Sequence, residues 1–512
     1  MRFQVLACTC CSATVELLNE DVFETAREVQ VLLDKKPVLA TKRNVFTLFG
    51  LEPDRDYELA IGKDSEVIHT RKVSYILHSS DFQKGPSDKD DTLRLQSAIM
   101  MTPKDGLLIL DDGDYQVTSL YLKSHITIEF APKARLLGST NPEDYPLYPG
   151  EITPSDARKK PLELGTWEGN PFLSKTSLLS GYEVEDVTLV GQGLIDGQAQ
   201  LSPFWNDVKH LSWSRPRLLF LVRCQHIQVI GLSFANAPCW TIHPYFSDHL
   251  EFYDLFLTNP KDSPNTDGLN PEACKDVRII GVRFSVGDDC IALKSGKIKI
   301  GSTFKKPTQD VVIRNCFMNE GHGAIVLGSE AGAGLKNLLI ERCLFKHTDR
   351  GLRIKSRRGR GKDSRMDGIV FKNIRMENVL TPLVINMFYF CDPDGKEDWV
   401  QSREKAKVDK TTPWLGHFTF ENLTCLDSEI ALGYFIGLPE QPIEEIVIRN
   451  SRFTVKKDAK PGYPAMLSGV EPMAKQGFLF ENVKRVVLDN VKATGYSGKE
   501  CQVANVGKVS QS

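Results

Sequence analysis

Short runs of alternating hydrophobic and polar residues fill the first 76 positions of the chain. Three of these runs, at residues 29–33, 45–49 and 57–61, are separated by turn-forming residues. Successive side chains of a strand point to opposite faces, so this pattern predicts short antiparallel strands with one buried face. We therefore predict a small β-sandwich over residues 1–76, and we interpret residues 1–11 as its first strand rather than as a secretory signal.

A polar break rich in Gly, Pro and Asp follows at residues 79–91. After this break, hydrophobic residues at helical spacing occupy positions 93–100. These two signals place the start of a second domain near residue 77. The chain is thus predicted to divide into domains at 1–76 and 77–512.

One short pattern recurs from there to the C-terminus: a hydrophobic strand segment, a Gly or Asn, and another hydrophobic residue soon after. It is found at residues 189–191, 229–234, 279–284, 313–317, 340–345, 371–374, 420–423, 448–453 and 487–491. The interval is roughly 23 to 40 residues, whereas a four-stranded propeller blade needs about 40 or more. Regular helices are not evident between the repeats. The second domain is therefore predicted to be a parallel β-helix of stacked coils, and the fold class all-β.

Composition restricts the possible partners. The chain has 512 residues, of which 41% are hydrophobic and 25% charged, and its net charge is −2. This charge gives no reason to expect nucleic acid or an acidic membrane as a partner. No apolar run is long enough for a membrane-spanning helix. Twelve scattered cysteines indicate reduced thiols, and with the absence of a convincing signal they predict a cytoplasmic protein.

Four polar motifs fall at the same phase of successive predicted coils. They are Asn265-Thr266-Asp267, Gly287-Asp288-Asp289-Cys290, Gly321-His322-Gly323 and Arg353-Ile354-Lys355. Strands of neighbouring coils lie about 4.8 Å apart, so three carboxylates, one histidine and two cations should share one cleft. Carboxylates at that distance cannot all ionise comfortably. One of them is therefore predicted to stay protonated near neutral pH and to act as an acid beside a base.

The residues around these charged groups affect how they are presented. Asp288 and Asp289 are adjacent, so they share a cleft only if the backbone departs from strand geometry, which the conformational freedom of Gly287 would allow. The two glycines around His322 should leave its ring accessible. Taken singly, each motif could be an ordinary turn, but together they predict a site.

In this order the four motifs resemble the signature of glycoside hydrolase family 28, the polygalacturonases and their relatives. Other segments of the second domain are also similar to that family, at residues 81–82, 90–92, 96–99, 123–127, 193–197 and 288–296. Residues 48–59 resemble the fibronectin type III pattern, in which a Leu-x-Pro turn leads into a strand bearing a Tyr. The resemblance to family 28 implies a right-handed parallel β-helix that hydrolyses α-1,4-galacturonosyl linkages with inversion. No metal or cofactor is expected, because side chains would supply the acid, the base and the charge stabilisation.

The resemblance also implies roles for individual residues. Asp288 would be the general acid, Asp267 and Asp289 would activate water, and His322 would support the acid. The remaining candidates are expected to bind the uronate substrate, a pectic oligogalacturonide, and are Arg353, Lys355, Lys294, Tyr389 and Asn265.

Some of these assignments have alternatives. Lys294 could be a solvated lysine, and Tyr389 could serve packing alone. The basic run Arg357, Arg358 and Arg360 either reaches further uronates or forms a solvated loop. Trp240 is expected in the core, and His243 is a weaker subsite candidate.

Three other functions compete with a polygalacturonase. A pectate lyase would need calcium and an arginine base, and a non-catalytic glycan-binding β-helix would need no cluster of three aspartates. A rhamnogalacturonan or xylogalacturonan hydrolase of the same family is nearer, but Arg353 and Lys355 favour plain polygalacturonide. Long insertions at about 141–180 and 391–416, together with the N-terminal domain, favour attack from the chain end on short oligogalacturonides. The oligomeric state remains open.

Overall fold

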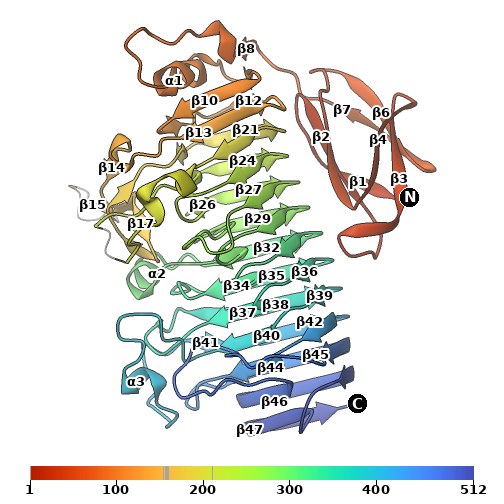
Figure 1. Cartoon of the computed structure of the whole chain (residues 1–512), viewed down its shortest axis with the longest axis vertical. Helices are drawn as coiled ribbons and strands as arrows, with labels where there is room; N and C mark the ends of the chain where they lie inside the picture. The colour runs from red at the N-terminus through yellow and green to blue at the C-terminus, as the bar shows by residue number, and fades with distance from the viewer. Residues whose placement is uncertain (1, 154, 156–160, 210–211) are drawn as a thin grey trace.

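The computed structural model describes residues 2–153, 155, 161–209 and 212–512. It is a tall stack of β coils with a small domain at its side (Figure 1). The small domain consists of two antiparallel sheets, which confirms the predicted sandwich. One sheet contains β1 (Phe3–Cys8), β2 (Ser12–Leu17) and β5 (Val45–Phe49); the other contains β3 (Glu24–Leu33), β4 (Lys36–Arg43), β6 (Asp56–Ile61) and β7 (Asp64–His69).

Alternating side chains of both sheets form the core of this sandwich, as the sequence pattern requires. Val15, Val31 and Leu59 are fully buried there. The Tyr57 hydroxyl accepts a 2.8 Å hydrogen bond from the backbone N–H of Glu52, within the segment that resembles fibronectin type III. A tyrosine bonded back to the turn before its own strand fixes that corner of a sandwich.

The second domain is a parallel β-helix built from three ladders of strands. The first ladder contains β8 (Ile76–His78), β9 (Gly106–Leu110), β12 (Ile126–Phe130), β21 (Glu185–Gly191), β24 (Gln225–Ile230), β27 (Asp248–Tyr253), β29 (Lys275–Ile280), β32 (Thr308–Arg314), β35 (Leu335–Glu341), β38 (Arg365–Lys372), β42 (His417–Glu421) and β45 (Ile443–Val455). The second ladder contains β10 (Gly113–Val117), β13 (Ala134–Gly138), β22 (Leu194–Asp196), β25 (Ser233–Ala235), β28 (Phe256–Thr258), β30 (Arg283–Ser285), β33 (Phe317–Asn319), β36 (Leu344–Lys346), β39 (Arg375–Glu377) and β43 (Thr424–Ser428).

The third ladder positions the candidate site. It contains β11 (Leu120–Tyr121), β20 (Leu179–Tyr182), β23 (Leu219–Val222), β26 (Ile242–Tyr245), β31 (Ile291–Leu293), β34 (Ile325–Gly328), β37 (Arg350–Lys355), β40 (Thr381–Asn386), β44 (Ala431–Ile436), β46 (Gln476–Thr494) and β47 (Cys501–Gln511). Single bridges at Leu269 join β26 to β31, so the ladder is continuous across the coil of Asp267.

Short elements decorate the stack. The helices are α1 (Thr92–Met101), α2 (Ile298–Phe304) and α3 (Asp398–Gln401), and the 3-10 turns are Ser79–Asp81, Pro142–Asp144, Ala199–Leu201 and Pro203–Trp205. The remaining strands are β14 (Leu147–Tyr148), β15 (Glu151–Ile152), β16 (Leu162–Glu163), β17 (Thr166–Trp167), β18 (Asn170–Pro171), β19 (Ser174–Lys175) and β41 (Trp414–Leu415). None of the helices in the described part of the chain is long and apolar enough to cross a membrane.

Stacked side chains fill the interior of the coils. Ile279, Ile313 and Ile340 occupy one register position on successive coils and are fully buried. The asparagines of the repeated pattern turn the corners, since Asn315 and Asn373 have φ values of +51° and +54°. Asparagine enters this left-handed region more readily than other side chains do, which explains the recurrence of Asn in the sequence repeat.

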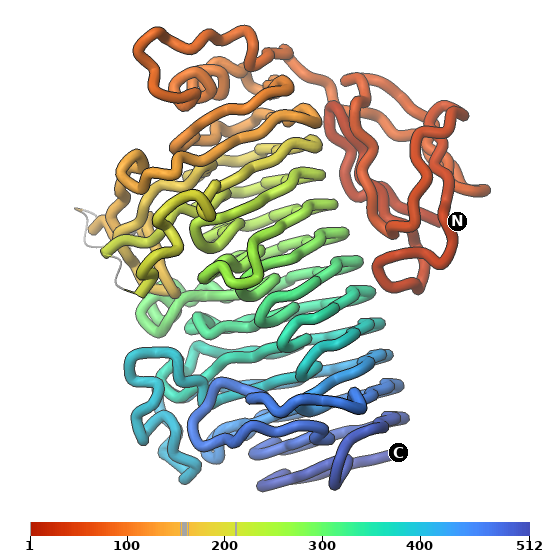
Figure 2. The backbone as a smooth tube through the Cα atoms, viewed as in Figure 1, coloured from red at the N-terminus to blue at the C-terminus, as the bar shows by residue number. Residues whose placement is uncertain are grey.

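The small domain is fixed to the side of the β-helix at the end of the first ladder. The fully buried Glu16 carboxylate accepts hydrogen bonds from Arg314 at 2.6 Å and from Arg342 at 3.0 Å. A Cβ on Gly281 would lie 2.5 Å from Val45, so glycine permits this close approach. Figures 1 and 2 show that the domain lies on the opposite side of the stack from β17, α2 and α3.

Candidate active site

The third ladder brings the four polar motifs together. Parallel pairing places Ile291 beside both Leu269 and Ile325, and Ile325 beside Leu352, so the four coils follow one another directly. Their side chains line one pocket of about 260 Å³. All nine residues to which the family resemblance gives a catalytic or substrate-binding role contribute to it, namely Asn265, Asp267, Asp288, Asp289, Lys294, His322, Arg353, Lys355 and Tyr389.

Asp289 is held between two cations. Its carboxylate oxygens are 3.1 Å from Arg353 Nη1 and 2.8 Å from Lys355 Nζ. Burial alone would raise the pKa of Asp289, but the charges of Lys355 and Arg353 outweigh burial and hold this pKa far below its usual range. Ile354, between the two cations, is fully buried in the coil interior. Arg353 and Lys355, expected to meet a substrate carboxylate, are thus already paired with a carboxylate of the protein.

Asp267 is in the opposite electrostatic situation. Burial and, after it, the neighbouring charge of Asp288 raise the pKa of Asp267 well above its usual range. Asp267 is therefore expected to retain a proton near neutral pH, while Asp289 is ionised. The sequence predicted a protonated carboxyl in this cluster and placed the acid at Asp288; in the structure the raised pKa falls on Asp267.

His322 is accessible and contacts the cluster. Its side chain is 52% exposed, and Nδ1 lies 3.1 Å from Asp288 Oδ1. This hydrogen bond is the main cause that raises the pKa of His322. The preceding Gly321 has a φ of +94°, and a Cβ there would lie 2.7 Å from the Asp288 carbonyl oxygen. Glycine at this position therefore lets the His322 coil approach the Asp288 coil.

Gly287 acts differently from the sequence-based expectation. Asp288 and Asp289 lie in a bend between β30 and β31, outside regular strand. However, Gly287 does not adopt a positive φ; a Cβ there would lie 2.5 Å from the Ser263 carbonyl oxygen and 2.6 Å from that of Pro260. Close backbone approach, rather than conformational freedom, explains this glycine.

The remaining predicted substrate-binding residues are engaged within the protein. Lys294 is buried, with Nζ 3.1 Å from Glu330 Oε2 and 3.9 Å from Asp267 Oδ2, so it is not a solvated lysine. Asn265 Oδ1 accepts a 2.6 Å hydrogen bond from Arg215. Tyr389 is only 9% exposed and lies with its ring 5.8 Å from Lys355 Nζ.

The pocket has further walls that the sequence motifs did not reveal. They are Trp167, Glu168, Trp240, Ser329, Glu330, Cys391, Asp392 and Met466. Trp240 was expected in the core, and it is only 3% exposed. It also borders the pocket, where its ring centroid lies 4.4 Å from Lys294 Nζ. Trp167 lies in the first insertion and Asp392 in the second. In the sequence, only the length of these insertions suggested that they contribute to the pocket. Met466 lies in a loop before β46 for which the sequence offers no signal.

Both sequence-based alternatives for the basic run after β37 are wrong. The three arginines are buried in ion pairs, Arg357 with Asp394, Arg358 with Glu440 and Arg360 with Asp392. They neither reach the pocket nor form a solvated loop, since these acidic partners from other loops draw them inward. His243 is likewise fully buried and bonded to Glu272, so it is not a subsite residue here.

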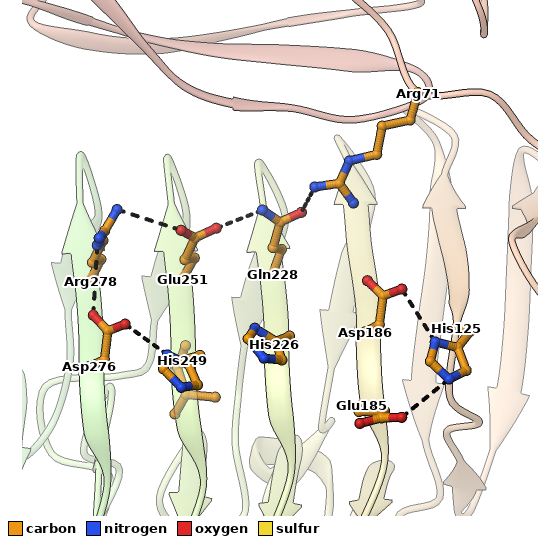
Figure 3. Close-up of a pocket in the computed structure, with 11 residues that line it drawn as sticks. Arg71, His125, Glu185, Asp186, His226, Gln228, His249, Glu251, Asp276 and Arg278 are labelled. Atoms are coloured by element: carbon orange, nitrogen blue, oxygen red, sulfur yellow. Dashed lines mark hydrogen bonds and ion pairs between the residues drawn. The ribbon is translucent and has the colours of Figure 1, made fainter.

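A larger hollow, of about 540 Å³, lies on the outer face of the first ladder beside Arg71. Figure 3 shows two rows of side chains along the ladder, one with Gln228, Glu251 and Arg278 and the other with His125, Asp186, His226, His249 and Asp276, while Arg71 reaches down to Gln228 from the segment between β7 and β8. Its charged groups largely pair with one another, such as His249 with Asp276 at 2.8 Å, and their side chains are 46% and 40% exposed. We therefore assign the chemistry to the smaller, buried pocket.

Comparison with known proteins agrees with this geometry. The sequence model of glycosyl hydrolases family 28 matches residues 163–401. A probable polygalacturonase of Vitis vinifera is 31% identical over 331 residues, 61% of this chain and 65% of that protein. An exo-poly-alpha-D-galacturonosidase of Dickeya chrysanthemi is 24% identical over 438 residues, 74% of this chain and 68% of that protein. The chain thus spans less than two thirds of the length of the Vitis relative.

Among solved structures, the family 28 exopolygalacturonase of Yersinia enterocolitica superposes with a TM-score of 0.73 at 19% identity. The superposition covers 99% of this chain and 98% of that one. An exopolygalacturonase of Thermotoga maritima gives a TM-score of 0.66 at 22% identity and covers 83% of this chain and 93% of that one. At these identities the likeness shows a shared fold, and the first superposition extends over the small N-terminal domain as well.

Proposed function

We propose that this chain, which belongs to family 28 of the glycosyl hydrolases, cleaves α-1,4-galacturonosyl linkages of pectic oligo- or polygalacturonide. The observation that carries the proposal is the buried pocket in which Asp267 and Asp289 have pKa values shifted in opposite directions. Carboxyls whose environments push their pKa values apart supply an acid and a base in one site. The names of the curated relatives, polygalacturonase and exo-poly-alpha-D-galacturonosidase, support the substrate.

The proposed reaction is an inverting hydrolysis. Asp288 donates a proton to the glycosidic oxygen, and the bond from this oxygen to the anomeric carbon breaks. A water molecule between Asp267 and Asp289 attacks the anomeric carbon from the opposite face and gives up its proton to a carboxylate. His322, bonded to Asp288, stabilises the carboxylate that remains after donation.

We further propose that attack occurs at the chain end. Trp167 and Glu168 of the first insertion and Cys391 and Asp392 of the second wall the pocket, which supports this mode. The N-terminal domain, also expected to favour it, contributes none of the described residues that line the pocket. The contacts of Glu16 with Arg314 and Arg342 support a structural role for this domain instead.

A cytoplasmic location is also proposed. All twelve cysteines are free thiols, and most of them are buried. A chain that keeps every thiol reduced is suited to a reducing compartment. A chain-end hydrolase in the cytoplasm would act on short galacturonides.

Proton NMR of the first minutes of hydrolysis tests the mechanism, together with the size distribution of the products. An inverting enzyme releases the β-anomer from an α-linked substrate before mutarotation, and chain-end attack releases monogalacturonate while long chains barely shorten. Early α-anomer would overturn inversion, and a ladder of intermediate oligomers would overturn only the chain-end mode. Binding without hydrolysis would identify a glycan-binding protein, and activity that needs calcium would identify a lyase.

A further inference from the structure

The outer face of the third ladder continues beyond the pocket, beneath the first insertion. Bridges place Glu272 beside both Tyr245 and Lys294, and Lys355 follows two coils later in the same row. His243, Asn270 and Glu272 lie on this outer face, but all three are fully buried. Polar side chains of this kind are typical of the floor of an open groove, but here other parts of the chain cover them. We call His243, Asn270 and Glu272 the floor, and the residues above them the cover.

Several polar atoms of this floor lack protein partners. His243 Nδ1 and both amide atoms of Asn270 have no hydrogen-bond partner among the described residues. A buried polar group without a partner destabilises the state in which it is buried. These side chains would be better solvated in an open groove than in their present buried state. Contacts between the cover and the rest of the β-helix must therefore keep the groove closed.

The hairpin β17–β18 forms the part of this cover that borders the pocket. Trp167 stacks on Trp240 with ring centroids 5.2 Å apart and planes inclined by 25°. The Gly169 carbonyl accepts a 2.9 Å hydrogen bond from the backbone N–H of Lys297. Gly169 has a φ of +71°, and a Cβ there would lie 2.7 Å from Lys297 N and 2.9 Å from Glu330 Cβ. The hairpin turn thus fits directly against the coil that carries Asp288 and Asp289.

Lys297 also joins this hairpin to the second insertion. Its Nζ lies 3.6 Å from Glu168 Oε2 and 3.1 Å from Asp392 Oδ1, and its side chain is only 15% exposed. Asp392 has additional partners in Arg357 and Arg360, so its own loop stays fixed without Lys297. Glu168 is half-exposed, and Lys297 is the partner that ties it to the opposite wall.

We propose that Lys297 is a specificity-determining residue: by joining Glu168 to Asp392 it holds the two insertions together and keeps the groove over the His243–Asn270–Glu272 floor closed. The inference rests on the proposed chain-end hydrolysis and adds the residue that enforces it. Without the ion pair, the Gly169 backbone hydrogen bond and the Trp167–Trp240 stacking still hold the hairpin, but it opens more often, so a galacturonide chain can extend over the uncovered floor. Cleavage then occurs within chains as well as at their ends.

The test compares Lys297→Met with Lys299→Met on long polygalacturonic acid. Lys299 lies two residues further on, in α2, and pairs with Glu151 of the first insertion at 2.9 Å, but it is 62% exposed and does not line the pocket. Viscosity per bond cleaved and product sizes are measured. We expect Lys297→Met to lower viscosity several-fold more per bond cleaved and to produce intermediate oligomers, whereas Lys299→Met behaves as the wild type does.

Two further variants keep the test decisive. Glu168→Gln removes the same ion pair by changing its half-exposed partner, so it should give the products expected of Lys297→Met even if Lys297→Met folds poorly. Lys297→Arg keeps the charge and should still release monogalacturonate as the product. A wild type that itself yields a ladder overturns the chain-end mode. If the wild type releases only monogalacturonate and Lys297→Met and Glu168→Gln do the same at unchanged kcat/KM, the bridge proposal is wrong and the proposed function stands.

Discussion

The pocket on the third ladder and the hollow on the first ladder contain the same kinds of side chain. Each has aspartates, histidine and arginine on successive coils, because a solenoid repeats any outward position at the spacing of its strands. In the hollow, His249 and Asp276 pair with each other while their side chains remain 46% and 40% exposed. In the pocket, Asp267 and Asp289 are 3% and 1% exposed. Stacking therefore gathers charged groups at many places, and burial decides where their pKa values separate.

The partners of the carboxylates differ as well. The pocket gives Asp289 two cations and Asp267 a neighbouring acid, so the two carboxyls respond in opposite directions. In the hollow each of His125 and His249 meets its own acidic partners in solvent. A site with unequal, buried partners can hold a proton beside an ionised base, which acid–base catalysis requires. The predictions below test this contrast, from the largest expected effect to the smallest.

Replacing the proposed acid should have the largest effect. Asp288→Asn removes proton donation in the transition state, so we expect kcat to fall by about 10²- to 10⁴-fold, with little change in KM or in the circular dichroism spectrum. Reducing-sugar release from polygalacturonic acid measures it. The matched change in the hollow, Asp186→Asn, should leave kcat at the wild-type value. If Asp288→Asn kept more than about a tenth of kcat, the acid assignment would be wrong.

Removing one cation from Asp289 should mainly lower stability. In Lys355→Met a buried carboxylate loses its 2.8 Å partner, and we expect the free energy of unfolding in urea at pH 7 to fall by about 3–5 kcal/mol. Since the pKa of Asp289 is depressed, this stabilisation is present above the ordinary Asp pKa of about 3.9 and is lost as the pH falls through the lower folded value. The deficit of the variant should therefore shrink in acid.

The hollow again provides the control for stability. Arg278→Met removes a side chain that is 52% exposed and 3.9 Å from its acidic partners, so its unfolding free energy should change by less than about 0.5 kcal/mol. If Arg278→Met and Lys355→Met lost the same unfolding free energy, burial would not determine how much an ion pair stabilises this protein.

The hydrogen bond between His322 and Asp288 should be visible in a titration. Because this bond raises the pKa of His322, Asp288→Asn should move the midpoint of His322 in an NMR titration to lower pH. The His322–Asp288 pair should stabilise the folded state fully at pH values below the pKa of an unfolded histidine. This stabilisation should disappear as the pH rises through the raised pKa of His322 in the folded state. A midpoint that is the same in Asp288→Asn and wild type would show that the ring is not coupled to Asp288.

The amino-acid sequence predicts the structure best where the chain follows the register of the coils. The four motifs lie at one phase of the repeat, so the assembly of Asp267, Asp289 and Arg353 in one pocket follows from strand spacing alone. The fold class follows from the same repeat. The pairing of Arg353 and Lys355 with Asp289 does not, because it depends on which way long side chains turn.

Residues outside the coil register could not be predicted. Trp167 and Asp392 reach the pocket through insertions whose path no periodicity fixes, and Met466 through a loop between β45 and β46. The direction of Arg358 is set by Glu440, 82 residues further along the chain. A local basic pattern therefore carries no information on whether such arginines face substrate, solvent or a buried acid.

The smallest effect is expected for the ion pair of the hollow itself. His249 and Asp276 lie 2.8 Å apart, but both side chains remain in solvent, which screens their charges and competes for their hydrogen bonds. A double-mutant cycle with His249→Ala and Asp276→Ala should give a coupling of about 0–1 kcal/mol in the free energy of unfolding, and kcat should be unchanged in all three variants. The stacked ring of His226, 4.7 Å from that of His249, is the shared neighbour that could add to this value. A coupling above about 2 kcal/mol, or a loss of activity, would mean that exposed charges on this ladder act like the buried ones and that burial is not what separates the two regions.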